Sequence, residues 1–283
     1  MARQSWRSRW LRFATAAVAS CLGPVMILST GPAGAEAIPA GVGFAGPAQR
    51  VTVGPARPGG SQHFPSRNWA GYITYDAGGT TDFNSVSATW VQPVVKCQTA
   101  QAWTVFWIGL DGWFDGTVEQ GGSSAYCPTA GGKPQYSLWW EMFPTNAIQS
   151  VLATAAGDTV TASVTYSAHR STFTITVKDL TSGKHFTRHE HCGGGQTCQR
   201  SSTDVITEDV GRFGAGNFFP LANYGTMSYA NAAAQDVAGH SGSISGSHWL
   251  NAAVTETAGG VTYATVSALS SAGRSFSTTW KHQ

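Results

Sequence analysis

Residues 159–166 read TVTASVTY, and this octapeptide determines the kind of structure expected from the chain. Its apolar side chains alternate with threonine and serine: Val160, Ala162, Val164 and Tyr166. Successive side chains of a β-strand point to opposite faces, so a period of two is typical of a strand with one buried face. A second run follows at 172–178, and TSGK at 181–184 has the composition of a hairpin turn. The stretch therefore predicts paired, half-buried strands.

Similar runs of β-branched and aromatic residues recur along the chain, separated by clusters of Gly, Asp, Asn and Ser that favour turns. These further runs are Trp69–Tyr75, Val86–Val91, Trp103–Gly109, Tyr136–Phe143, Asp204–Glu208, Val261–Leu269 and Ser275–Trp280. Only Ala230–Val237 has a composition that a short helix could use. About 215 residues of short strands without a linker predict one all-β domain. We expect a sandwich of two antiparallel sheets, of the jelly-roll or concanavalin-like kind.

The beginning of the chain has a different pattern. Four arginines are followed by an apolar stretch and by Ala33-Gly34-Ala35, an A-x-A cleavage motif. These features predict a signal peptide over residues 1–35 and secretion to the extracellular space. Residues 36–65 are rich in Pro, Gly and Ala, so we expect a linker or short propeptide with little structure of its own. Residues 66–283 are the predicted sandwich domain.

Removing the leader changes both the charge and the cysteine count. The chain has 17 Lys and Arg against 15 Asp and Glu, and four of the arginines lie in the leader, which leaves 13 − 15 = −2. The basicity is therefore a targeting signal and predicts neither nucleic-acid binding nor membrane association after processing. The four cysteines beyond Cys21 predict two disulfides. Of the three possible pairings we prefer Cys97–Cys127 and Cys192–Cys198, because each closes a short loop; geometry decides between them.

Acidic side chains are scarce, so those that lie among apolar residues are candidates for chemistry. Glu141 lies in SLWWEMF, where alternation puts it on the same face as Trp139. Glu208 ends a run on the face of Ile206, and Asp111 follows WIGL. A carboxylate among apolar neighbours is costly to ionise, so such residues are often functional. The alternative for each is a hydrogen-bonded structural residue.

Seven short pieces of the chain carry a resemblance through their order and spacing. They are NWAG at 68–71, VSATWVQP at 86–93, FWIGLDG at 106–112, VEQGG at 118–122, WWEMFP at 139–144, GD at 157–158 and VITED at 205–209. Together they resemble the glutamic peptidase (eqolisin) family of secreted acid endopeptidases. The resemblance implies two packed antiparallel sheets, protein or peptide substrates, and no metal or other cofactor.

The motifs also imply roles for particular residues. The resemblance makes Gln120 and Glu208 the catalytic pair. It further implies a set of residues that line or support the substrate cleft: Trp107, Asp111 and Glu141. Where the family usually has an apolar residue before the Gln, this chain has Glu119, and strand alternation predicts that Glu119 points to the opposite face.

The implied chemistry needs only these side chains. A carboxylate can take a proton from water and later return it to the leaving nitrogen. A Gln amide does not titrate, and it can donate a hydrogen bond to the oxyanion. Four tryptophans either line a substrate groove, as expected of Trp139, or pack in the core: Trp103, Trp107, Trp139 and Trp140.

Other functions fit part of the same pattern. A carbohydrate-binding sandwich would use tryptophan platforms, and its enzymatic version would use Glu141 and Glu208 as a glycosidase pair. A catalytically inactive relative of the peptidases is a third reading. His185, His189 and His191 lie close together, but the distant Cys or His pair that a zinc site requires is missing. We expect a monomeric peptidase.

Overall fold

The structure is a computed structural model of the 283-residue chain, and it describes residues 43–50, 62–76, 82–212 and 217–282. The predicted signal peptide, residues 1–35, lies outside the described residues. Within the described ranges the secondary structure consists of strands, and no helix there is long and apolar enough to cross a membrane. The all-β expectation is therefore confirmed.

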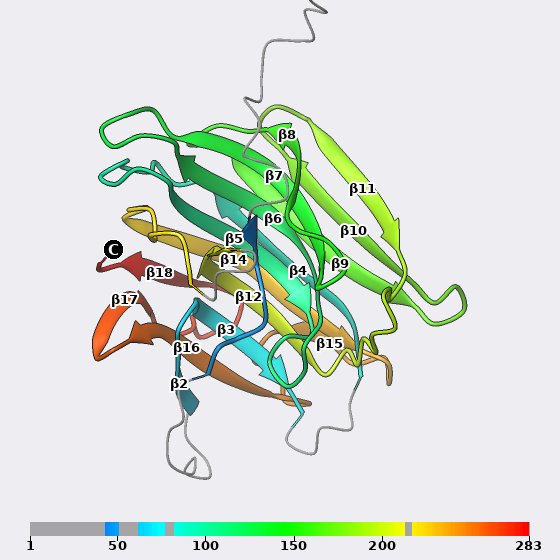
Figure 1. The fold of residues 1–283 in the computed structure, drawn as a ribbon. Coiled ribbons are helices and arrows are strands. Elements are labelled where there is room, and N and C mark those ends of the chain that lie inside the picture. Colours follow the sequence, from blue (N-terminus) through cyan, green and yellow to red (C-terminus); the bar gives the residue numbers. More distant parts are fainter. Residues whose placement is uncertain (1–42, 51–61, 77–81, 213–216, 283) are drawn as a thin grey trace, which may run out of the picture. The chain divides into compact units, whose positions relative to one another are not determined.

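The strands form one hydrogen-bonded path that folds back on itself into two layers (Figure 1). The first layer is, in spatial order, β16 (Leu250–Ala258), β3 (Trp69–Tyr75), β12 (Ser202–Asp209), β5 (Ala102–Leu110), β6 (Val118–Cys127), β7 (Gln135–Phe143) and β8 (Gln149–Ala153). The second layer is, in spatial order, β11 (His185–Glu190), β10 (Thr172–Asp179), β9 (Thr159–Ser167), β4 (Phe83–Val91) and β14 (Thr226–Asp236). The strands β18 (Phe276–Trp280) and β17 (Val261–Val266) connect β14 to β16.

Neighbouring strands of both layers pair antiparallel, and β4, β9 and β10 pack across the core against β5 and β6. This is the predicted sandwich of two antiparallel sheets. Three short strands add to it: β2 (Gln62–Ser66) pairs parallel with β16, β15 (Ser241–Ser243) pairs with β14, and β1 (Gly43–Phe44) pairs with β13 (Gly211–Arg212). All the predicted runs overlap strands, and TSGK at 181–184 is the turn between β10 and β11.

The first layer is apolar on both faces, and the alternation within β5 demonstrates this. Phe106 and Ile108 point into the cluster between the layers, where they join side chains of β9 and β10. Val105 and Trp107 point to the other face, into a second buried cluster with Trp69 and Trp139. A strand that is buried on both faces carries apolar residues in succession, which is why β5 reads AWTVFWIGL. The second cluster forms the floor of the candidate site.

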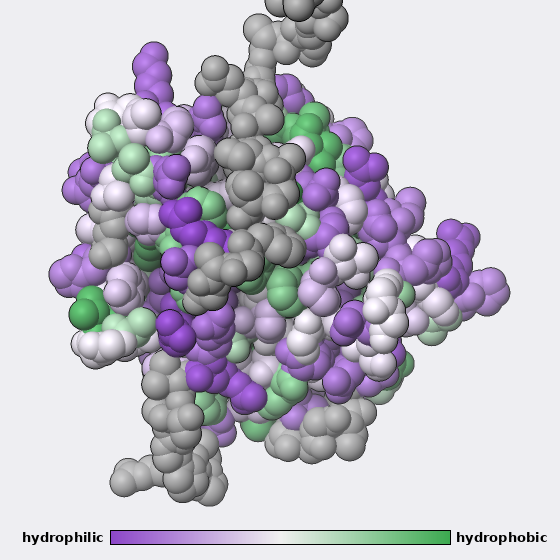
Figure 2. All heavy atoms as spheres, in the orientation of Figure 1, coloured by the Kyte–Doolittle hydropathy of each residue, from purple (hydrophilic) through white to green (hydrophobic). Residues whose placement is uncertain are grey.

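The outer edge of the second layer has the opposite character. Most side chains of the edge strand β11, including His185, Arg188 and His189, are exposed. Figure 2 shows mainly hydrophilic residues over the edge where β10 and β11 lie. Charged side chains on an edge strand hinder pairing with another chain.

Several strands were not among the predicted runs, and for two of them, β14 and β6, the physical reason is clear. The helical expectation for Ala230–Val237 was wrong, because this stretch belongs to β14, which pairs with β4, β15 and β18. Alanine has the highest helix propensity, but such preferences amount to less than about 1 kcal/mol per residue, and pairing with neighbours on both sides outweighs them. Strand β6 reads VEQGGSSAYC, in which Val118 is the single β-branched residue. A Cβ atom at Gly122 would lie 2.0 Å from the carbonyl oxygen of Phe106, so close strand approach explains the glycine.

Both predicted disulfides are present. Cys97 and Cys127 are bonded at 2.05 Å, and Cys192 and Cys198 at 2.08 Å. Cys127 is the last residue of β6, so the first disulfide ties the end of this strand to the loop after β4. Disulfides of this kind are typical of oxidising compartments.

Candidate active site

Strand pairing brings Gln120 and Glu208 to the same face of the first layer. Glu208 on β12 lies opposite Val105 of β5, and Gln120 on β6 lies opposite Gly109 of the same strand. Ile206 belongs to the same buried cluster as Val105, so Glu208 shares the face of Ile206 as the alternation predicted. Two residues from motifs almost ninety positions apart are thus held by regular backbone pairing.

The carboxyl group of Glu208 is fully buried, with 0% of the residue exposed. Its Oε1 atom accepts a hydrogen bond from the Asn68 amide at 2.9 Å, and its Oε2 atom accepts one from the Trp107 indole N–H at 3.0 Å. Burial raises the pKa of Glu208 well above its ordinary value; the Asn68 and Trp107 hydrogen bonds lower it, whereas the nearby carboxylates raise it further. The group is therefore ready to hold a proton in acid while its ionised form is also hydrogen-bonded.

Gln120 and Glu141 lie opposite each other on β6 and β7. Both are fully buried, and burial raises the pKa of Glu141 well above its ordinary value, against the lowering effect of the Ala45 backbone N–H. One oxygen of each, Gln120 Oε1 and Glu141 Oε1, has no hydrogen-bond partner among the described residues. Buried polar atoms are normally satisfied, so two unpaired acceptors beside Glu208 favour a site that holds a further polar group.

The backbone of residues 43–50 lies directly on these three side chains. Gln120 Nε2 donates to the carbonyl oxygen of Ala45 at 2.5 Å, and Glu141 Oε2 accepts from the Ala45 N–H at 2.9 Å. The Gly46 N–H donates to Glu208 Oε1 at 3.2 Å. Figure 1 draws this segment in blue, passing over the strands of the first layer. The segment falls inside residues 36–65, where little structure of its own was expected, and its order comes from contacts with the site.

The tryptophans form a buried floor. Trp107 and Trp139 are both 0% exposed, and Trp69 packs edge-on against Trp107 with ring centroids 5.1 Å apart. Trp103 is also buried, whereas Trp140 is partly buried against the cluster between the layers. Stacking on a sugar ring requires an accessible aromatic face, and these buried rings do not offer one. The tryptophan platform of the carbohydrate-binding alternative is therefore not formed by Trp103, Trp107 or Trp139.

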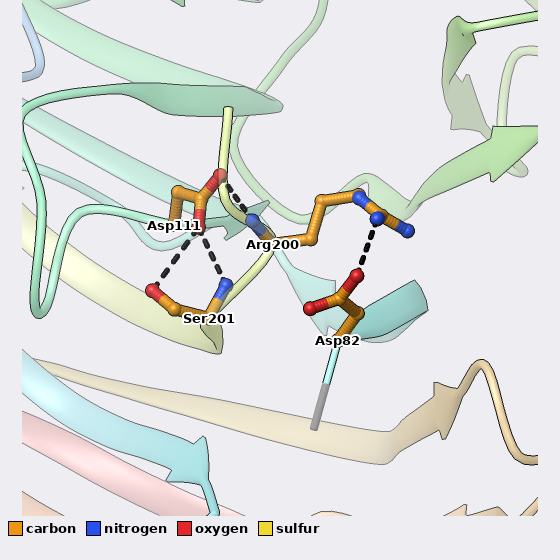
Figure 3. A network of polar contacts seen from close by, with 4 residues as sticks. All are labelled: Asp82, Asp111, Arg200 and Ser201. Atoms are coloured by element: carbon orange, nitrogen blue, oxygen red, sulfur yellow. Dashed lines mark hydrogen bonds and ion pairs between the residues drawn. The ribbon is translucent and has the colours of Figure 1, made fainter. Parts of the chain in front are cut away.

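Asp111 is held in a different environment from the other predicted site residues. Figure 3 shows its carboxylate directed at the start of β12, where it accepts hydrogen bonds from the backbone N–H groups of Arg200 at 2.7 Å and Ser201 at 2.6 Å. The Arg200 guanidinium turns away to form an ion pair with Asp82 at 2.6 Å. Asp111 thus anchors the loop that leads into the strand of Glu208, and its hydrogen bonds are not with residues 43–50.

Glu119 belongs to the environment of Asp111. It is buried, and its pKa is raised well above the ordinary value, first by burial and then by the negative charges of Asp111 and Asp115. Gln120 contacts Ala45 on the other face, so the alternation expected of Glu119 and Gln120 is present. The charged residue that departs from the family pattern therefore lies away from the candidate catalytic pair.

Sequence reasoning missed two contributors to the site. Asn68 connects Glu208 to the segment, because its Nδ2 atom also donates to the carbonyl oxygen of Pro47 at 3.3 Å and its Oδ1 atom accepts from the Gln49 N–H at 2.8 Å. Its place in the NWAG motif could have marked it. No local pattern could have marked residues 43–50. In the described part of the chain, no three His, Cys, Asp or Glu side chains form a metal-binding group, and Cys192 beside the histidines is in a disulfide.

The fold and the site define a two-layer β-sandwich with a buried amide–carboxyl pair beneath a peptide backbone. Comparison with known proteins agrees with this class. The model of the Peptidase A4 family matches residues 67–277, three quarters of the chain, and the chain belongs to this family. The family consists of glutamic peptidases, so membership of it supports the interpretation of this chain as a peptidase. No curated protein sequence matches the chain significantly.

Solved structures share the fold. Scytalido-glutamic peptidase with a transition state analog inhibitor superposes with a TM-score of 0.63 at 21% identity, over 76% of this chain and 98% of that one. SCP-B, a member of the eqolisin family in complex with the tripeptide Ala-Ile-His, has a TM-score of 0.60 at 21% identity, with the same coverage. Aspergilloglutamic peptidase from Aspergillus niger has a TM-score of 0.54 at 21% identity, over 64% of this chain and 100% of that one.

Proposed function

We propose that the chain is a secreted endopeptidase that hydrolyses peptide bonds of proteins in acid through Gln120 and Glu208. One observation carries this proposal: a peptide bond, between Ala45 and Gly46, lies between the two side chains. Its carbonyl oxygen accepts from Gln120, and its N–H donates to Glu208. This is the arrangement that amide hydrolysis requires, because the oxygen becomes negatively charged and the nitrogen must receive a proton.

The proposed reaction uses each contact in turn. The Glu208 carboxylate takes a proton from water, and the water oxygen bonds to the carbonyl carbon. The oxyanion that forms accepts a hydrogen bond from the side-chain N–H of Gln120. This amide stays neutral at every pH of the cycle. Glu208 then gives its proton to the amide nitrogen, the carbon–nitrogen bond breaks, and a carboxylic acid and an amine are released. Trp107 and Asn68 orient the Glu208 carboxyl group throughout.

Acidic conditions suit this cycle. Glu208 must be ionised in one step and protonated in the next, so its pKa has to lie near the working pH. Burial raises that pKa, which makes Glu208 both a better proton acceptor and a group that keeps a proton in acid. Export of the chain is supported by the basic, then apolar leader and by two disulfides.

The test is cleavage of a denatured protein from about pH 2 to about pH 7, with and without a pepstatin-type inhibitor of aspartic peptidases. We expect inhibitor-resistant cleavage in acid. Gln120→Ala removes the oxyanion donor and should slow cleavage by about 10²–10³-fold. Glu208→Gln removes the proton carrier and should slow it by about 10²–10⁴-fold.

Asp236→Asn is the matched control, because Asp236 is a similarly buried acid on β14 of the second layer, where its carboxylate accepts from the His240 N–H at 3.0 Å. It should keep the wild-type rate in acid. Full activity of Glu208→Gln would contradict the assignment of the catalytic pair, and no cleavage at any pH would favour an inactive relative.

A further inference from the structure

The outer face of the second layer carries polar side chains in three rows that cross the sheet. Directly paired residues of antiparallel neighbours share a face, so the register of the strands defines each row. The first row runs from β15 to β11 through Ser241, Gln235, Ser85, Thr165, Thr174 and His189. The second row crosses the same strands through Ser243, Ala233, Ser87, Ser163, Thr176 and Thr187. The third row begins on β14 and consists of Ala230, Thr89, Thr161, Lys178 and His185.

The rows face solvent, because the alternate residues of the same strands form the core. Val86, Val164 and Ile175 are buried between the layers, whereas the residues of the rows are partly or fully exposed. Apart from two alanines, every residue of the rows is polar, and none of them is acidic. Positive charge is concentrated at the β10–β11 end, where Lys178 lies opposite His185.

A polar hollow adjoins the other end of the rows. Its volume is about 320 Å³, and its polar lining consists of Ser85, Ser87, Gln235, Ser241 and Arg274. Pockets for apolar ligands are lined mainly by hydrophobic and aromatic side chains, so hydroxyl, amide and guanidinium groups suit a polar, negatively charged ligand. Five strand spacings of ~4.8 Å separate β15 from β11, so the rows span about 24 Å (Figure 1).

We propose that this face binds an anionic polysaccharide. Its acidic groups would pair with Arg274 at the hollow and with Lys178 and the histidines at the β11 end, while its hydroxyl groups hydrogen-bond with the serines and threonines between them. The proposal goes beyond the peptidase function and does not depend on it. The catalytic pair lies on the outer side of the first layer, so a polysaccharide on the second layer leaves it free.

The composition of the rows distinguishes a polysaccharide from other partners. Protein interfaces are centred on large anchors such as Trp and Tyr, and single-stranded nucleic acids stack on aromatic rings. Helices that bind a membrane surface insert apolar side chains. The rows contain no aromatic side chain apart from the imidazole rings and no large apolar one. Ser and Thr hydroxyls both donate and accept hydrogen bonds, which matches the hydroxyl groups of a sugar.

Acid increases the positive charge at the β11 end. His185 and His189 are exposed, and β11 is the last strand of the sheet, so β10 is its pairing partner. The charged and titratable groups around the two histidines are Lys178, Lys184, Arg188, Glu190 and His191. The Asp179 carboxylate turns back to accept from the N–H groups of Thr181 and Ser182. Histidine gains a proton in mildly acidic water, whereas carboxylates keep most of their charge above about pH 4. Affinity for a polymer of acidic sugars should therefore rise as the pH falls to about 5.

The test measures binding of the full chain to immobilised polygalacturonate by biolayer interferometry, with dextran as the neutral control. A Glu208→Gln background prevents proteolysis. The two added histidine charges should make binding at about pH 5 roughly 10–30-fold tighter than at about pH 8, because one cation near an anionic surface contributes about fivefold. Added salt should weaken binding through screening, and dextran should not be retained.

Two pairs of variants locate the binding face. Lys178→Gln removes a charge from the third row and should weaken binding about fivefold. Its control is Arg188→Gln on the opposite face of β11, where the guanidinium lies 5.7 Å from the centre of the Trp140 ring; binding should change by less than about twofold. Gln235→Glu adds a carboxylate of the same shape beside the hollow and should weaken binding about fivefold. Its control, Gln98→Glu, adds the same charge next to Asn223, outside the rows, with less than about twofold effect.

Each outcome supports or overturns the proposal. Equal losses from Lys178→Gln and Arg188→Gln, or from Gln235→Glu and Gln98→Glu, would mean that net charge alone governs binding, and would overturn the assignment of this face. Equal retention on dextran would overturn the pairing with acidic groups. A folded wild-type chain that does not bind polygalacturonate at either pH would overturn the proposal altogether. None of these results bears on the peptidase function, which is measured separately with a soluble substrate.

Discussion

A cluster of buried carboxyl side chains makes the stability of this domain dependent on pH. Asp111 and Asp204 are 0% exposed and Glu119 is 1% exposed, and all three lie close to Asp115. Burial, with the negative charge of Asp115 as a second cause, raises the pKa of Asp111 from 3.8 to about 7. Burial and the neighbouring carboxylates raise the pKa of Glu119 and Asp204 well above their ordinary values as well.

The sign of the effect follows from linkage. A carboxyl group whose pKa is higher in the folded state binds more protons there, so it contributes stability below its unfolded pKa and loses that contribution as the pH rises through the folded value. For Asp111 the window runs from about pH 4 to above pH 7, and roughly three pKa units correspond to on the order of 4 kcal/mol. Domains are typically stable by about 5–15 kcal/mol, so this one group carries a large share.

Urea unfolding at a series of pH values measures this dependence, in a Glu208→Gln background that prevents self-digestion. We expect the free energy of unfolding to fall steeply between about pH 4 and about pH 8. Asp204→Asn removes one of the raised carboxyl groups while its side-chain oxygen can still accept from Ser202, so the fall should be smaller. Glu190→Gln, on the outer strand β11, should keep the original slope. A stability that is constant or rises over this range would refute the reasoning.

Two further predictions concern the fold. Gly122→Ala should destabilise the domain by about 3 kcal/mol or more, because the new Cβ would lie 2.0 Å from a backbone oxygen of β5. Gly116→Ala, where nothing lies within 4 Å, should change stability by less than about 0.5 kcal/mol; equal melting temperatures for the two variants would contradict the packing argument. The Cys97–Cys127 disulfide closes 30 residues and the Cys192–Cys198 disulfide closes 6, so replacing each pair by serine should cost about 3–4 and about 2 kcal/mol respectively. A larger loss from the shorter loop in urea unfolding would contradict this order.

Local pattern was sufficient for the fold class. The alternation in 159–166 and the runs around it predicted strands because side-chain direction along a strand depends only on neighbouring residues. The stretch 230–237 was misread because the helix preference of its alanines is a local signal, whereas the partners that make it a strand, β4 and β18, are distant in the sequence. The cysteine loops predicted both disulfides because short loops bring their ends together at low entropic cost.

For the candidate site, too, some features follow from local sequence and others only from the tertiary structure. By itself, the sequence determined the all-β sandwich, the two disulfides and the motifs that contain Gln120 and Glu208. Tertiary structure alone decided that Asp111 anchors a loop while residues 43–50 lie on the catalytic pair. The hydrogen bonds that hold this segment join residues 75, 96 and 162 positions apart, and no periodic pattern extends over such separations. They form through backbone atoms, which every residue carries, so the amino-acid letters of the segment do not reveal them.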